Sequence, residues 1–142
     1  MSEVKTISVE RGATTLPTIG TYKHLFTVSD YIRVLCLLGV VTTDIQDQAN
    51  DAKLTSTPTV GAQVDLCTAL ETNGDHVGTM YTITGTLANP MVATTSGAVP
   101  SQTPVVVAPG FIDLHCAATN TGAIKWTIIY EPIMASATVS AS

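Results

Sequence analysis

The chain has 142 residues, of which 45% are apolar and only 12% are charged, and its formal net charge is −5. This length predicts one domain that can bury a core without disulfide support. The six basic residues are scattered singly, so the sequence offers no basic patch and argues against nucleic-acid binding. Threonine and small residues replace the missing charges, which suits strands and surfaces that pack against other proteins.

The sequence also disfavours membrane insertion and secretion. Its most apolar run, IRVLCLLGVV at residues 32–41, contains Arg33 and is well short of the ~20 residues that a spanning helix needs. The N-terminal stretch MSEVKTISVE lacks the apolar core of a signal peptide. We therefore expect a soluble protein that is made in a cytoplasm.

Residues 1–20 differ from the rest of the chain because they contain few large apolar groups and only one candidate strand, KTISVE at 5–10. We interpret this segment as an extended arm that lies along a neighbouring subunit, and a frayed terminus is the alternative. The apolar points that would contact the neighbour are Ile7, Val9, Leu16 and Ile19.

Residues 21–142 read as short strands separated by turns. Residues 31–45 are apolar and β-branched but are interrupted by Gly39, which predicts either one strand with a bulge or bend or two strands. Residues 62–70 and 79–87 alternate between apolar and polar positions, and the polar stretch 46–53 predicts a loop or a short helical turn.

The segment GFIDLHCAATNTGAIKWTIIYEP at 110–132 predicts a β-hairpin. In its first strand Ile112, Leu114 and Cys116 share one face, and in its second strand the face is shared by residues 124, 126, 128 and 130. The TNTG sequence at 119–122 supplies the tight connection.

Repeated short strands with regular turn signals, and no amphipathic helix, predict an all-β fold. We expect a single-domain antiparallel β-sandwich or barrel at residues 21–142, preceded by the extended arm at 1–20.

The predicted hairpin also contains the most chemically suggestive residues. Asp113 and His115 share a face, and Lys125 lies on the neighbouring strand, so the group could form an acid–base pair or half of a metal site. The interpretation we prefer is a solvated polar face with an Asp113–Lys125 ion pair. Trp126 is expected to anchor the core or an interface.

Two polar turns are weak candidates for cation binding. One contains Glu71, Asp75 and His76, and the other is DIQDQAND at residues 44–51. Neither has the regular spacing of a calcium loop, so solvated turns are the preferred interpretation.

The sequence contains no nucleotide-binding, hydrolase or zinc motif. Its cysteines, Cys36, Cys67 and Cys116, have no metal-type spacing and each lies in an apolar stretch, so we expect buried free thiols. We predict no catalytic, cofactor-binding or metal-binding residues.

The C-terminal phrase APGFIDLHCAATNTGAIKWTIIYEPI, followed by ATVSA, resembles the end of small virion proteins of tailed double-stranded DNA bacteriophages. The phrases GVVTTDIQ, KLTSTPTVG and GTMYTITGTL are similar to upstream strands of these proteins. The resemblance covers roughly residues 36–141 and excludes the predicted arm. It implies a structural role, as a capsid decoration (cement) protein, a head-fibre base or a tail component.

A decoration role implies that the protein binds the major capsid protein on the outer surface of the phage head after synthesis in the host bacterial cytoplasm. It also implies a small homo-oligomer, with a trimer favoured, and neither a cofactor nor a nucleic-acid or membrane partner. Many repeated weak contacts would stabilise the lattice through avidity. The second contact segment would be the loop at residues 88–104, which contains Pro90, Pro100 and Pro104.

Two other classes of function remain open from the sequence. A tail- or head-fibre module that binds carbohydrate or a host surface would need exposed aromatic side chains, and the chain has one Trp, four Tyr and two Phe. An enzyme would need a convergent polar pocket, which the sequence does not display.

Overall fold

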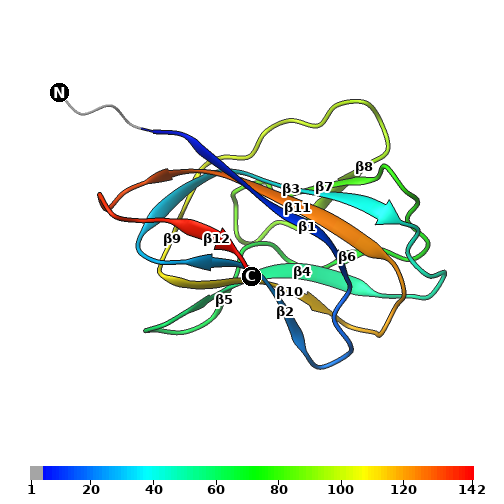
Figure 1. The fold of residues 1–142 in the computed structure, drawn as a ribbon. Coiled ribbons are helices and arrows are strands. Elements are labelled where there is room, and N and C mark those ends of the chain that lie inside the picture. The colour runs from blue at the N-terminus through cyan, green and yellow to red at the C-terminus, as the bar shows by residue number, and fades with distance from the viewer. Residues whose placement is uncertain (1–4) are drawn as a thin grey trace.

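The computed structural model describes residues 5–142, and it contains two six-stranded antiparallel sheets packed face to face (Figure 1). Sheet A contains, in spatial order, β1 (Ile7–Thr15), β11 (Ala123–Pro132), β3 (Ile32–Thr43), β7 (Met80–Thr82) and β8 (Val92–Thr94), and β9 (Val105–Val107) also pairs with β3. Sheet B contains β12 (Val139–Ala141), β2 (Tyr22–Val28), β10 (Gly110–Cys116), β4 (Asp51–Pro58) and β5 (Val64–Asp65), and β6 (Leu70–Glu71) also pairs with β4. The all-β prediction is confirmed, and the described strands form a sandwich rather than a closed barrel.

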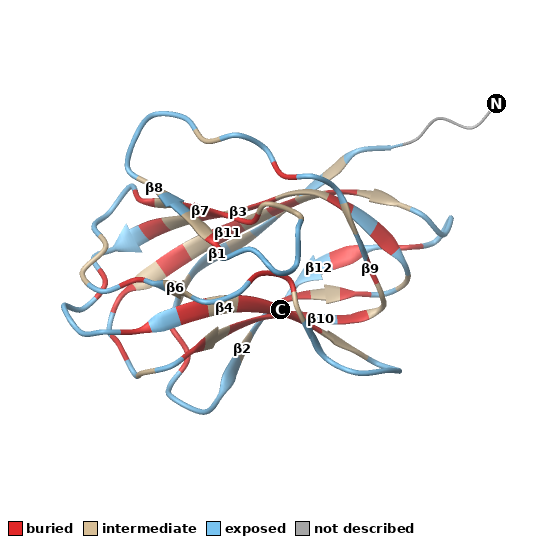
Figure 2. Ribbon diagram, turned by 180° about the vertical axis from the view of Figure 1, so that it is seen from behind, coloured by how far each residue is buried: buried red, intermediate tan, exposed pale blue. Residues whose placement is uncertain are grey.

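The core lies between the two layers and is built by alternation along the strands. Along β11 every second residue is buried, and Figure 2 shows the same alternation on the strands that line the gap between the sheets. The fully buried side chains include Trp126, Tyr81, Phe26 and Leu54. Each strand therefore places one face against the opposite sheet, as the antiparallel pleat requires.

The expected N-terminal arm is not evident among residues 5–20. β1 is an edge strand of sheet A that pairs with β11 from Ile7↔Tyr130 to Thr15↔Ala123. Ile7 and Val9 pack against the core because they pair with Tyr130 and Ile128 of β11, and Leu16, which follows β1, is buried. Of the four proposed contact points only Ile19 is largely exposed, at 64%. Residues 1–4 of the predicted arm lie outside the described residues.

The predicted hairpin at 110–132 is wrong, although its buried faces are right. β10 pairs with β2 and β4 in sheet B, whereas β11 pairs with β1 and β3 in sheet A. Residues 117–122 therefore carry the chain from one sheet to the other. Alternation defines which face of a strand is buried but not whether two such strands pair edge to edge or face each other across the core.

β3 is one continuous strand, and Gly39 is not at a bulge. In the β11–β3 register Gly39 stands opposite Trp126, and in the β3–β7 register it stands opposite Tyr81. A Cβ at position 39 would lie 2.6 Å from the Trp126 ring, which is closer than packed atoms allow. The glycine thus makes room for the indole to lie across β3 toward Tyr81.

Replacing Gly39 with alanine is expected to lower the free energy of unfolding by about 1–3 kcal/mol, because the new methyl group overlaps the indole. Guanidinium denaturation followed by circular dichroism measures this change. Gly97→Ala is the matched control, since a Cβ at Gly97 meets nothing within 4 Å, and it should change stability by less than about 0.5 kcal/mol. Equal stability of the two variants would contradict the packing argument.

Candidate functional site

Asp113 is the centre of a polar network on the outer face of sheet B. Its neighbours Ile112 and Leu114 face the core, so Asp113 faces away from it, yet it is only 1% exposed. Its carboxylate oxygens contact His24 Nδ1 on β2 at 2.6 Å and the Thr57 hydroxyl on β4 at 2.8 Å. The central position of β10 between β2 and β4 makes both contacts possible. Asp113 is therefore not the solvated residue that the sequence predicted.

The predicted Asp113–Lys125 ion pair does not form, because these residues lie in different sheets. Lys125 pairs instead with Glu10 of β1, with 2.8 Å between Nζ and Oε1. A bulge in β2 explains how His24 reaches Asp113. The register shifts at Leu25, so that Leu25 and Phe26 both face the core while His24 and Tyr22 return to the outer face.

The network continues through hydrogen bonds to β2 and to the segment before β5. Gln63 Nε2 donates to the Thr57 hydroxyl at 2.8 Å, and the Tyr22 hydroxyl donates to Gln63 Oε1 at 3.2 Å. Each group thus fixes the next one, which pre-orients the polar atoms on this face.

Four rings lie over the same network, and we call them the ring platform: Tyr22, His24, Phe111 and His115. His24 stacks on Phe111 with 4.0 Å between ring centroids, and Tyr22 packs at a tilt on His115 at 4.9 Å. Tyr22 and Phe111 are both exposed. The platform therefore offers apolar ring surface beside fixed hydrogen-bonding groups.

The geometry does not complete a nucleophilic site around His24 and Asp113. The Thr57 hydroxyl donates to the Asp113 carboxylate, and Cys116 faces the core, where burial raises the pKa of its thiol to about 11. Within residues 5–142 no three His, Cys, Asp or Glu side chains gather closely enough to hold a metal ion. What the arrangement can do chemically is donate and accept hydrogen bonds and stack.

The acidic side chains of the two other polar turns accept hydrogen bonds that hold neighbouring segments together. Asp44 accepts the backbone N–H of Val77 at 2.8 Å, and this bond holds the pKa of Asp44 below its usual value. Glu71 accepts the N–H of Asn50 at 2.7 Å, which lowers the pKa of Glu71 in the same way. Asp75 accepts a hydrogen bond from the Tyr81 hydroxyl, whose pKa is raised first by burial and then by this carboxylate.

The cysteines are free, and Cys67 and Cys116 are buried as predicted. Burial raises the pKa of the Cys67 thiol to about 11. Cys36 is only half-buried, and its thiol pKa is also raised by burial. These values describe thiols that stay protonated near neutral pH, which suits a packing role.

A second surface, which the sequence did not predict, is an apolar groove where sheets A and B meet beside β5 and β9. Its volume is about 270 Å³. The side chains that define the apolar groove are Val60, Ala62, Val64, Leu87, Val105 and Val106. Val60 is 88% exposed and Val106 is 62% exposed, which is unusual for two aliphatic residues in one depression.

The loop at 88–104 adjoins the apolar groove, because the residues that flank this loop in sequence, Leu87 and Val105, both line the groove. Pro90, Pro100 and Pro104 are exposed. Near Pro90 the loop is tied to Thr68 by two backbone hydrogen bonds, and Pro100 lines a small pocket of about 250 Å³ with Ile83 and Val92. The contact role of these prolines stays a prediction.

No protein-family model, curated protein sequence or solved structure matches the chain. Within the part of the chain that the structure describes, no helix is long and apolar enough to cross a bilayer.

Asp113→Ala is expected to lower the free energy of unfolding by about 1.5–3 kcal/mol, because two hydrogen bonds to a buried carboxylate are lost. Asp65→Ala is the control, since Asp65 forms a partly exposed ion pair with Lys53 and should cost at most about 1 kcal/mol. Denaturant titration of both variants at neutral pH makes the comparison. Similar losses would show that the Asp113 network does not organise this face.

Proposed function

We propose that this chain is a virion structural protein of a tailed bacteriophage, most specifically a capsid decoration protein that binds the outer surface of the head and stabilises its lattice. In this proposal it contacts the major capsid protein and associates with copies of itself, with a trimer as the expected assembly. The observation that carries the proposal is the apolar groove, and the resemblance at residues 36–141 agrees with it.

The apolar groove supports a protein-binding role for a physical reason. Val60 and Val106 are exposed aliphatic side chains. A partner that removes them from water lowers the free energy by roughly 25 cal/mol for each Å² of apolar surface buried. They occupy a depression rather than isolated positions, so a single apolar residue of a partner can contact several of them at once.

The composition supports the same proposal. Only 12% of the residues are charged, and no charged side chain lines the apolar groove. Charged residues are depleted at the centres of protein interfaces. A site repeated over a symmetric lattice would reach high avidity from modest individual contacts.

The combined Val60→Thr and Val106→Thr variant is expected to bind phage heads at least about tenfold more weakly, because a partner must bury two hydroxyls without acceptors. Threonine keeps the β-branched shape, so the fold should be unchanged. Co-sedimentation with heads measures binding, and light scattering after gel filtration measures the assembly. Val77→Thr is the control, because Val77 is 60% exposed but lies outside the apolar groove. Equal binding by both variants would remove the groove from the proposal.

The ring platform favours a second candidate function, a fibre-type module that binds carbohydrate on a host surface. Exposed rings beside fixed hydrogen-bonding side chains are the chemistry that recognises a sugar, because the ring contacts its C–H face and the polar groups contact its hydroxyls. The polar side chains His24 and Thr57 beside these rings are already connected through Asp113.

Tyr22→Ala and Phe111→Ala are expected to weaken binding to host surface polysaccharide at least about tenfold, since each removes an exposed ring. Isothermal titration calorimetry with the purified polysaccharide measures the affinity. Tyr31→Ala is the matched control, because Tyr31 is exposed to the same degree as Tyr22, 43% against 44%, but is not part of the platform. Absence of polysaccharide binding by the unaltered protein would exclude this candidate and leave the decoration proposal intact.

A further inference from the structure

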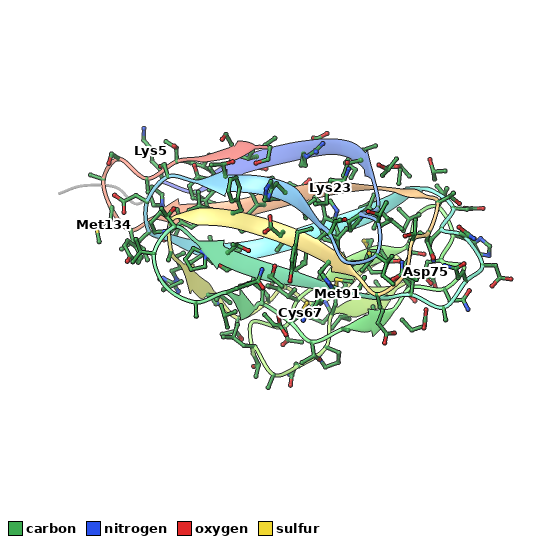
Figure 3. The ribbon with its side chains drawn as sticks, turned by 90° about the horizontal axis from the view of Figure 1, so that it is seen from below. Lys5, Lys23, Cys67, Asp75, Met91 and Met134 are labelled. Atoms are coloured by element: carbon green, nitrogen blue, oxygen red, sulfur yellow. The ribbon has the colours of Figure 1, made fainter. Side chains whose placement is uncertain are left out.

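Two basic side chains from opposite sheets, Arg11 and Lys23, line one cleft between β1 and β2. Arg11 stands opposite the buried Trp126 in sheet A, and Lys23 stands opposite the buried Leu114 in sheet B. Directly paired residues project to the same face of a sheet, so both basic residues project toward the space between the layers. The cleft that they line has a volume of about 550 Å³. Lys23 is labelled in Figure 3.

Neither of these cations has an acidic partner among the described residues. Lys53 and Lys125 form ion pairs with Asp65 and Glu10, whereas Arg11 and Lys23 form none. Lys23 Nζ instead reaches across to the Thr15 hydroxyl, at 3.4 Å. The Nε–H group of Arg11 is covered by the protein and has no hydrogen-bond acceptor.

The rest of the cleft suits an anion. No Asp or Glu side chain lines it, although the chain as a whole has a net charge of −5. Its lining also contains His24 and a group of hydroxyl-bearing residues, Thr15, Thr18, Thr21, Tyr22 and Ser142. The cleft therefore places two cations that lack an acidic side-chain partner beside several hydroxyl groups, of which those of Thr21 and Tyr22 already donate to Thr18 and Gln63.

We propose that this cleft is an oxyanion-binding site that takes a carboxylate or a phosphate group. The planar guanidinium of Arg11 matches two oxygens of either group, and the Lys23 ammonium adds a point charge from the opposite sheet. The cleft is larger than a single phosphate, so it can admit an oxyanion that is attached to a larger molecule. The inference is independent of the apolar groove and of the decoration role.

The test is a titration of isotope-labelled protein with inorganic phosphate, followed by ¹H–¹⁵N NMR at constant ionic strength with chloride as the counter-titrant. We expect saturable shifts at the Arg11 Nε–H and at the amides of Thr15 and Lys23. Arg11→Gln and Lys23→Gln should each weaken binding about tenfold or more, and Arg11→Lys should weaken it less than Arg11→Gln because the charge is kept. A parallel titration with a di-glutamate peptide distinguishes a carboxylate ligand from a phosphate ligand.

Lys125→Gln is the control, because it changes the net charge equally but removes a lysine that already has an acidic partner. The proposal is overturned if neither probe gives saturable shifts, or if Lys125→Gln weakens binding as much as Lys23→Gln does. Each variant's near-ultraviolet circular dichroism, which reports the packing of buried Trp126, verifies that the fold is retained.

Discussion

The contact between the Trp126 indole and the bare backbone of Gly39 is the constraint on which the arrangement of sheet A depends. Trp126, Gly39 and Tyr81 form one row across β11, β3 and β7, and the indole occupies the space that a Cβ would take. The indole N–H has no acceptor among the described residues, so shape alone positions the ring. A slip of β11 by one residue would place a side chain under the indole and turn the apolar face of β11 outward.

The two lateral openings of the sandwich differ in chemistry. The cleft of Arg11 and Lys23 lies between β1, an edge strand of sheet A, and β2, which lies next to the edge strand β12 in sheet B, whereas the apolar groove lies beside β5 and β9. The ring platform occupies the outer face of sheet B between them, over Asp113. A chain with so few charged residues thus keeps its apolar groove apart from its basic cleft, whereas the ring platform adjoins the cleft through Tyr22 and His24.

The sequence predicted what depends on local alternation and failed where strands from distant parts of the chain meet. The buried faces of 111–116 and 123–130 could be predicted, because each strand has one apolar side. Their placement in different sheets could not, because the same alternation fits both pairings. The arm was predicted because residues 1–20 contain few large apolar groups, whereas residues 7–15 form a strand because they pair with β11.

The residues of the candidate surfaces also could not be grouped from the sequence, because they come from distant parts of the chain. The sequence singled out Asp113 and His115, but the partner of Asp113 is His24, which lies 89 residues earlier. No local signal connects these positions, and none connects Arg11 with Lys23, since each pair exists only after β2 has taken its place in sheet B. The exposure of the prolines in the 88–104 loop could be predicted from the sequence. The apolar groove could not, because it forms only where β5 and β9 come together.

The pairing of β1 with β11 joins strands that are roughly a hundred residues apart in sequence, and β2 likewise pairs with the distant strand β10. On the ribosome the first two strands therefore emerge long before their partners exist, with unpaired edges and exposed apolar faces. Such distant pairings close large loops and slow the folding reaction. A nascent chain can therefore complete both sheets only after β10, β11 and β12 have been synthesised.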